Sequence, residues 1–134
     1  RNYFKVSLRA LMKNPLSSFI NITGLSMGGY GTWDLLARFP DKFAAAVPIC
    51  GGGDPQTAAT ISHIPIWAFH GALDEVVVPR HSRVMIKALQ DAGGEPGYTE
   101  YPGVAHNSWE NAYGDPHLLP WMFAQHLGKK SKDK

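Results

Sequence analysis

The stretch FINITGLSMGGYGTWDLLARF, residues 19–39, decides the fold of this 134-residue chain. Its first five residues are β-prone, with Ile20 and Ile22 on one face, and predict a strand over 19–23. Residues 27–39 then place Trp33, Leu36 and Phe39 at helical spacing, and a proline ends the pattern. A strand that passes through a glycine-flanked turn straight into a helix is typical of a parallel sheet.

The alternation of strands and helices continues toward the C-terminus. We expect strands over 43–49, 64–69 and 97–101, helices over 80–92 and 118–127, and a basic amphipathic helix over 3–14. Pro48 cannot donate to a ladder, so we place it at the end of its strand. The prediction is one α/β domain over 1–134, with about four mostly parallel strands flanked by helices, an atypical N-terminal helix over 1–18 and a disordered basic tail over 128–134.

The composition excludes several classes of protein. Hydrophobic residues make up 44% and charged residues 18% of the chain, which argues against disorder, and the net charge of +2 gives no reason to expect a nucleic-acid partner. Cys50 is the only cysteine, so neither an intrachain disulfide nor a cysteine-based zinc cluster can form. The sequence has no run of 18 apolar residues, which is about the length that a membrane-spanning helix needs. We expect a cytoplasmic protein without a metal or a cofactor.

The pentapeptide Gly24-Leu25-Ser26-Met27-Gly28 carries the first candidate chemistry. It matches the pattern G-x-S-x-G and lies where a strand should end and a helix begin, which is the sharp turn that exposes a nucleophilic serine. In that geometry the backbone N–H of Met27 points at the oxyanion of an acyl-transfer reaction. The alternative is an ordinary glycine-rich turn.

A serine nucleophile needs a base and an orienting carboxylate, in the chain order Ser, Asp or Glu, His. Asp74 follows the third predicted strand and His106 follows the fourth. Both therefore fall at the same edge of the sheet as Ser26, where ligands of α/β sheets bind. Asp54, after the second predicted strand, is an alternative orienting group, whereas Glu75 should point elsewhere.

The remaining candidates have simpler interpretations. His70 ends a strand and is expected to be a hydrogen-bonded structural residue, and Cys50 an inert core residue. The helical phase of Trp33 favours the core. Tyr30 and Trp109 are candidate substrate-binding residues that could equally be core aromatics. The other histidines lie on predicted loops or helices, and we expect them to be solvated or partly buried: His63, His81, His117 and His126.

Residues from about 20 to about 127 resemble the C-terminal half of an α/β-hydrolase of the esterase, dienelactone-hydrolase and predicted-peptidase group. The resemblance rests on residues 24–33 (GLSMGGYGTW), on 70–74 (HGALD) with 77–79 (VVP), and on 101–106 (YPGVAH) with Trp109. It implies that Ser26 is the nucleophile, Asp74 the orienting residue and His106 the general base.

The chain also departs from that family. About 20 residues precede the turn, without the His-Gly-Gly-Gly-like loop that supplies a second oxyanion donor, and residues 1–22 resemble the N-terminus of FtsX/MacB-like permeases. We therefore expect a recombinant or truncated reading frame with an exposed edge strand over 19–23, which would pair with another copy in a homodimer or higher oligomer. Loss of one oxyanion donor costs about 10²–10³ in rate, unless the backbone of Gly51–Gly53 or a partner chain replaces it.

The sequence predicts a serine esterase that cleaves small, short-chain acyl esters, with amide and lactone hydrolysis left open because the same residues serve all three reactions. Two other hypotheses remain. The chain could be an inactive remnant that acts as an oligomeric or ligand-binding module. It could also be a module that the basic helix over 3–14 holds at a membrane surface.

Overall fold

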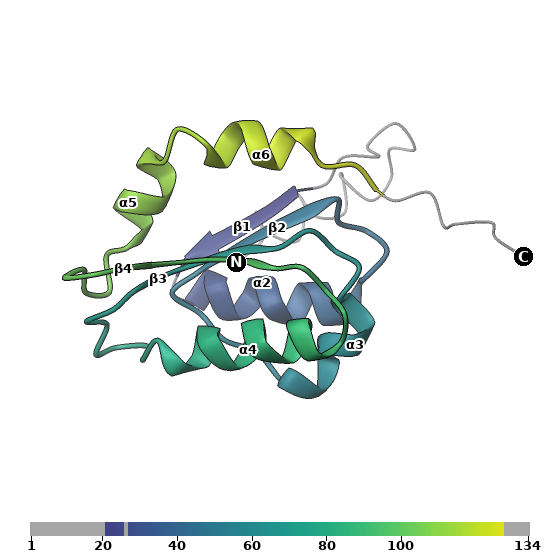
Figure 1. The fold of residues 1–134 in the computed structure, drawn as a ribbon, viewed down its shortest axis with the longest axis horizontal. Coiled ribbons are helices and arrows are strands. Elements are labelled where there is room, and N and C mark those ends of the chain that lie inside the picture. Colours follow the sequence, from purple (N-terminus) through teal and green to yellow (C-terminus); the bar gives the residue numbers. More distant parts are fainter. Residues whose placement is uncertain (1–20, 26, 128–134) are drawn as a thin grey trace, which may run out of the picture.

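A computed structural model describes residues 21–25 and 27–127 of the chain. One sheet of four parallel strands lies at its centre, in the order β1 (Asn21–Leu25), β2 (Ala45–Ile49), β3 (Trp67–Gly71) and β4 (Gly97–Tyr101). Figure 1 shows one layer of helices on one face, with α2 (Met27–Arg38), α3 (Ala58–Ile61) and α4 (Arg80–Asp91). Over the opposite face lies α6 (Leu118–Ala124), which α5 (Trp109–Gly114) connects to β4. The predicted α/β class is confirmed.

The two faces of the sheet each bury an apolar cluster. Toward α2, α3 and α4 the cluster includes Trp33, Leu36, Ala46 and Ile66, and toward α5 and α6 it includes Phe69. Every residue of β2 is buried. A strand covered on both faces reads as a continuous apolar run, as AAVPI does over 45–49. The core therefore fixes the sheet between two helical layers.

Most of the predicted elements are present with small changes in their bounds. The helices expected over 27–39 and 80–92 correspond to α2 and α4, and the strand expected over 97–101 is β4. The terminal helix is shorter than expected, because extended backbone begins at Gln125. The sequence analysis missed α3, α5 and the short 3₁₀ helix η1 (Pro55–Thr57). The helix expected over 3–14 and the tail over 128–134 lie outside the described residues.

Pro48 corrects one prediction. We expected it at the end of a strand, but it lies inside β2, opposite Gly24 in the register with β1. On the side of β2 that faces β3, the N–H groups of Ala46 and Cys50 donate to the carbonyl oxygens of Pro65 and Phe69. Pro48 lies midway between these two donors, at the position where the ladder would have its next N–H. Because proline has no N–H, the β2–β3 ladder is interrupted there, and the central strand keeps the proline at the cost of one hydrogen bond.

Among the described residues, no helix combines the length and the apolar character that crossing a membrane requires.

Candidate active site

The strands of the sheet all end at the same edge, because they are parallel. β1 ends at Leu25 and α2 begins at Met27, so the predicted nucleophile Ser26 is the single residue that connects them. Ser26 itself lies outside the described residues. The Met27 side chain is 88% exposed, and its backbone N–H belongs to the first turn of α2, where amides have no acceptor within the helix. This is the chain geometry that the G-x-S-x-G pattern predicts.

The structure brings Asp74 and His106 together at this edge. Asp74 follows β3, His106 follows β4, and the Nδ1–H of His106 donates to Oδ2 of Asp74 at 2.8 Å. The Asp74 side chain is completely buried, and its Oδ1 accepts from the N–H groups of Val76 and Val77, both at 2.9 Å. Burial raises the pKa of Asp74, but the hydrogen bonds from His106, Val77 and Val76 outweigh it and hold the pKa below its ordinary value.

The loop that carries His106 is fixed against the loop that carries Asp74. Ala72 and Leu73 donate their N–H groups to the carbonyl oxygens of Tyr101 and Val104, at 3.0 and 2.9 Å. The His106 side chain is 21% exposed, and its ring meets the ring of Trp109 edge-on with centroids 5.5 Å apart. The imidazole is therefore oriented by a carboxylate on one side and by an aromatic ring on another.

Cys50 lies closer to this site than the sequence analysis expected. It is fully buried, as predicted for a core residue, but its Sγ–H donates to the carbonyl oxygen of His106 at 3.1 Å and its sulfur lies 2.8 Å from Oγ of Ser108. The backbone of Cys50 has a φ of 50°, a left-handed conformation that costs a non-glycine residue about 1 kcal/mol or more. Its position directly after β2 was the signal in the sequence, because that position falls at the same edge as Asp74 and His106.

Among the described residues, one group of side chains could hold a metal ion, and it consists of Cys50, Asp74 and His106. Atoms of Cys50, Asp74 and His106 that could act as ligands all lie within 4.8 Å of one another. Zinc would need the thiolate form of the cysteine, whereas burial raises the pKa of this thiol. It would also compete with the hydrogen bond between Asp74 and His106. The arrangement therefore suits proton transfer better than metal binding.

The other predicted candidates separate clearly. Asp54 does not orient His106, because its Oδ1 accepts from the N–H of Gln56 at the start of η1, and Glu75 is exposed. Trp33 is 1% exposed and belongs to the core, as its helical phase predicted. Trp109 is partly buried and packs both against the apolar cluster and against His106, so both of its proposed roles remain compatible with its place.

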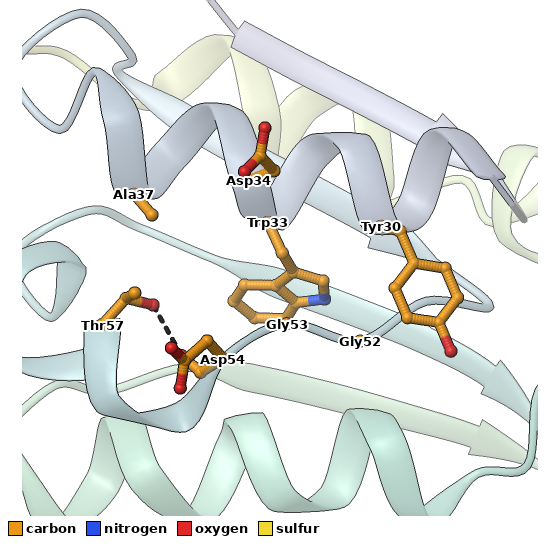
Figure 2. A pocket seen from close by; sticks show the side chains of 8 residues that line it. All are labelled: Tyr30, Trp33, Asp34, Ala37, Gly52, Gly53, Asp54 and Thr57. Carbon is orange, nitrogen blue, oxygen red and sulfur yellow. Dashed lines mark hydrogen bonds between the residues drawn. The ribbon is translucent and has the colours of Figure 1, made fainter.

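Tyr30 lies at the end of a cavity of about 370 Å³ between α2 and the loop after β2. Figure 2 shows the rings of Tyr30 and Trp33 along one side of this cavity, with Asp54 and Thr57 across from the helix. The loop after β2 can pass this close to α2 because both segments have glycine at the contact, Gly51 in the loop and Gly29 in the helix. A Cβ at Gly51 would lie within 2.7 Å of the Cα of Gly29.

His70 is buried and hydrogen-bonded, as expected for a structural histidine. Its side chain is completely inaccessible, and its two ring nitrogens lie 2.7 Å from Oγ of Ser82 and 2.7 Å from the carbonyl oxygen of Val77. The sequence analysis did not predict that His70 also lies 3.2 Å from the Asp74 carboxylate. His70 lies in a strand and Asp74, four residues later, lies in the turn that follows it, and this spacing gave no indication of the contact.

A parallel sheet with helices on both faces, a first strand followed directly by a helix and an Asp–His pair at the carboxyl edge define this chain as part of an α/β-hydrolase fold. The family model of the dienelactone hydrolase family matches residues 1–115. The chain belongs to the dienelactone hydrolase family. Because the match begins at residue 1, it includes the segment that resembles permeases, and the comparisons give that second resemblance no support.

Solved structures show the same fold. A thermostable esterase superposes with a TM-score of 0.86 at 40% sequence identity, over 94% of this chain and 37% of the esterase. SOBER1 of Arabidopsis thaliana superposes with a TM-score of 0.62 at 20% identity, over 90% of this chain and 57% of SOBER1. An acylaminoacyl peptidase of Pyrococcus horikoshii gives 0.71 at 20% identity, over 98% of this chain and 27% of the peptidase.

One curated relative, an uncharacterized secreted protein of Arthroderma benhamiae, is 33% identical over an alignment of 115 residues. The match covers 63% of this chain and 12% of that protein. The chain thus spans a small part of that relative and about a third of the thermostable esterase. A cytoplasmic location stays a prediction.

Proposed function

We propose that this chain is a serine carboxylesterase that cleaves small, short-chain acyl esters. Ser26 is the nucleophile, His106 the general base and Asp74 the residue that orients the base. The observation that carries the proposal is the 2.8 Å hydrogen bond between Nδ1 of His106 and Oδ2 of Asp74, on loops that follow neighbouring strands. A base held by a buried carboxylate is what a hydroxyl nucleophile requires.

The proposed reaction follows from the protonation states of these groups. Ser26 attacks the ester carbonyl while His106 takes its proton, and His106 then returns that proton to the leaving alcohol. Asp74 stays ionised throughout, in keeping with its lowered pKa, and stabilises the imidazolium that forms. Water attacks the acyl-enzyme in the same manner and releases the acid. In each step a proton moves to or from His106.

The oxyanion of each tetrahedral intermediate needs donors at the start of α2. We assign one of them to the backbone N–H of Met27, in the first turn of that helix, where the helix dipole also favours negative charge. The backbone of Gly51–Gly53 is the proposed source of a second donor, because Gly51 packs against the backbone of Gly29 and Tyr30. A phosphonate bound to Ser26 that meets only one N–H would exclude this assignment.

One observation favours an ester over an amide. The thermostable esterase shares 40% of its aligned residues with this chain, whereas the peptidases share about half as many and therefore show the fold alone. For the acyl group of the substrate, Met27, Leu73 and Val76 expose apolar side chains on the segments that carry the proposed catalytic residues. An apolar rim suits an acyl chain, and we assign Tyr30 and Trp109 to substrate contacts beside it.

The test is the hydrolysis of p-nitrophenyl acetate and butyrate by the purified protein and by Ser26→Ala. A matched control is Ser62→Ala, since Ser62 caps the end of α3. Turnover that disappears in Ser26→Ala and persists in Ser62→Ala supports the proposal. An equally slow rate in all three proteins would overturn it and favour an inactive module.

We also propose that β1 pairs with a second copy of the chain. Within the described part of the sheet β1 is an edge strand, hydrogen-bonded to β2 alone. An unpaired strand edge is a template for another strand. Light scattering that shows a monomer at micromolar concentration would contradict this proposal.

A further inference from the structure

A second histidine also approaches the Asp74 carboxylate. His70 is in β3, and its Nε2 lies 3.2 Å from Oδ2 of Asp74, the same oxygen that accepts from His106. Its side chain and that of Asp74 are both completely buried. A buried imidazole must have partners for both ring nitrogens, so its hydrogen bonds reveal which nitrogens carry protons.

The partners of His70 leave one consistent arrangement of hydrogens. The carbonyl oxygen of Val77, 2.7 Å from Nε2, can only accept, so Nε2 carries a hydrogen. The carbonyl oxygen of Gly51 can also only accept, so the hydroxyl of Ser82 donates its single hydrogen there, at 2.9 Å. Nothing remains for Ser82 to donate to Nδ1 of His70, 2.7 Å away, so Nδ1 must be the donor of that bond.

Both ring nitrogens of His70 therefore carry hydrogens, which makes the ring an imidazolium. The neutral alternative would require the Ser82 hydroxyl to turn toward Nδ1. The oxygens of Ser82 and Gly51 would then face each other at 2.9 Å inside the protein with no hydrogen between them. Leaving a buried acceptor without a donor costs about 1–3 kcal/mol, which favours the protonated ring.

We infer that His70 is a doubly protonated positioning residue that keeps Asp74 ionised and directed at His106. The inference rests on the proposed function of Ser26 and His106. With His70 included, both oxygens of the Asp74 carboxylate are held: Oδ1 accepts from the N–H groups of Val76 and Val77, and Oδ2 accepts from His106 and forms an ion pair with His70 at 3.2 Å.

The charges around His70 match this assignment. Asp74 faces it from the loop after β3, and Glu100 lies opposite it in the register with β4. Arg83 of α4 and Tyr98 of β4 bind Glu100, and the Arg83 hydrogen bond holds the pKa of Glu100 at about 2 although burial raises it. Cys50 and His106 meet the other sides of Asp74. The imidazolium thus has two carboxylates as neighbours, that of Asp74, which is buried, and that of Glu100, which is partly exposed.

A positioning role makes a specific demand on the kinetics. The charge of His70 acts on Asp74 and not on the substrate, so its loss should lower kcat and leave KM unchanged. A shift of the base by about 1 Å costs about 10² in rate, and we expect a decrease of that size in His70→Gln. Ser82→Ala removes the acceptor of Nδ1–H, makes the neutral ring stable and should lower kcat in the same direction with the packing of β3 intact.

The experiment has two independent parts. The first is NMR of the wild-type protein with ¹⁵N-labelled histidine at pH 7 to 8, with His70 assigned from the signals that His70→Gln or Ser82→Ala removes or shifts. Two hydrogen-bearing ring nitrogens are expected, and a single one overturns the inference whether or not the protein hydrolyses esters. This part would therefore still decide the charge of His70 if the proposed function failed.

The second part is the kinetics of p-nitrophenyl acetate hydrolysis by His70→Gln and Ser82→Ala. His63→Gln is the matched control, since His63 is exposed and touches the carbonyl oxygen of Pro40. A lower kcat with unchanged KM in both variants, and no change in the control, supports the positioning role. An unchanged kcat in either variant, or a decrease that lies entirely in KM, overturns it. Should His70→Gln fail to fold, Ser82→Ala carries the same test.

Discussion

Replacing Asp74 with asparagine changes one atom at the centre of the candidate site. The Oδ1 oxygen can keep its two backbone hydrogen bonds, from Val76 and Val77, if the amide oxygen takes that place. The amide nitrogen then stands where Oδ2 was, 2.8 Å from Nδ1 of His106. Because that nitrogen is a donor, Nδ1 of His106 must become an acceptor, and the ring hydrogen moves to Nε2. The imidazole is then in the wrong tautomer to take a proton from Ser26.

The size of the effect follows from this geometry. A wrong tautomer in a serine hydrolase with intact geometry lowers kcat by about 10⁴. The amide N–H that donates to Nδ1 of His106 replaces a charge-assisted hydrogen bond by a neutral one, and the ion pair between Asp74 and His70, 3.2 Å apart, is lost. A hydrogen bond to a charged group contributes about 1.5–3 kcal/mol, so the variant should lose about 1.5–3 kcal/mol of unfolding free energy. A domain of average stability, about 5–15 kcal/mol, would still fold near 20 °C.

The assay combines kcat for p-nitrophenyl acetate with urea unfolding of the same preparations of wild type, Asp74→Asn and Glu75→Gln. The last variant makes the same chemical change one residue away, on an exposed side chain, and should behave as wild type in both measurements. A folded Asp74→Asn protein with kcat within tenfold of wild type would refute the assignment of Asp74 as the orienting residue.

Three further outcomes follow from the same contacts. Gly71→Ala should lower kcat at least tenfold and the unfolding free energy by about 2–4 kcal/mol, because its Cβ would overlap the backbone oxygens of Ala105 and Val104, next to His106. In Gly31→Ala the new Cβ lies in mid-helix and meets nothing within 4 Å, so this variant should instead raise the unfolding free energy by about 0.5–1 kcal/mol. Equal effects of the two variants in urea titrations would contradict both expectations. The lowered pKa of Asp74 contributes stability that is present above the unfolded carboxyl pKa, near 3.8, and is lost as pH falls through the lower folded value; the urea midpoint of wild type should therefore fall more than that of Asp74→Asn as the pH is lowered below 3.8, and parallel decreases would refute this linkage. Since burial raises the pKa of the Cys50 thiol, iodoacetamide should label it at neutral pH only after urea is added, as mass spectrometry would show.

The sequence was sufficient for the fold and for the position of the site because local patterns decide both. Residues 19–39 contain the complete strand–turn–helix signal. Once the strands are parallel, residues that follow them must share one edge. Asp74 and His106 could therefore be paired without coordinates, although their sequence positions are 32 residues apart. The short helices α3 and α5 were missed because segments of four and six residues carry too few positions for a helical period.

The place of Pro48 could not be predicted from propensity. A proline in a central strand conflicts with the rule that prolines occur at edges and strand ends, and the rule was applied here. What the sequence does not show is which neighbour each N–H would meet. The structure places this position between two donors to β3, so that only one bond of the ladder is lost.

The contacts that support the candidate site are of a different kind. Cys50 directly follows β2, His70 lies in β3 and Ser82 lies in α4. Each has an ordinary sequence explanation as a core residue, a strand residue or a helix residue. Their relation to Asp74 and His106 depends on hydrogen bonds that cross between elements, and no spacing along the chain encodes those. A buried carboxylate needs several donors before its charge is tolerated. Sequence reasoning can therefore predict that Asp74 must have such partners, and it takes the packed structure to show that one of them is a second histidine whose own hydrogen bonds require it to be charged.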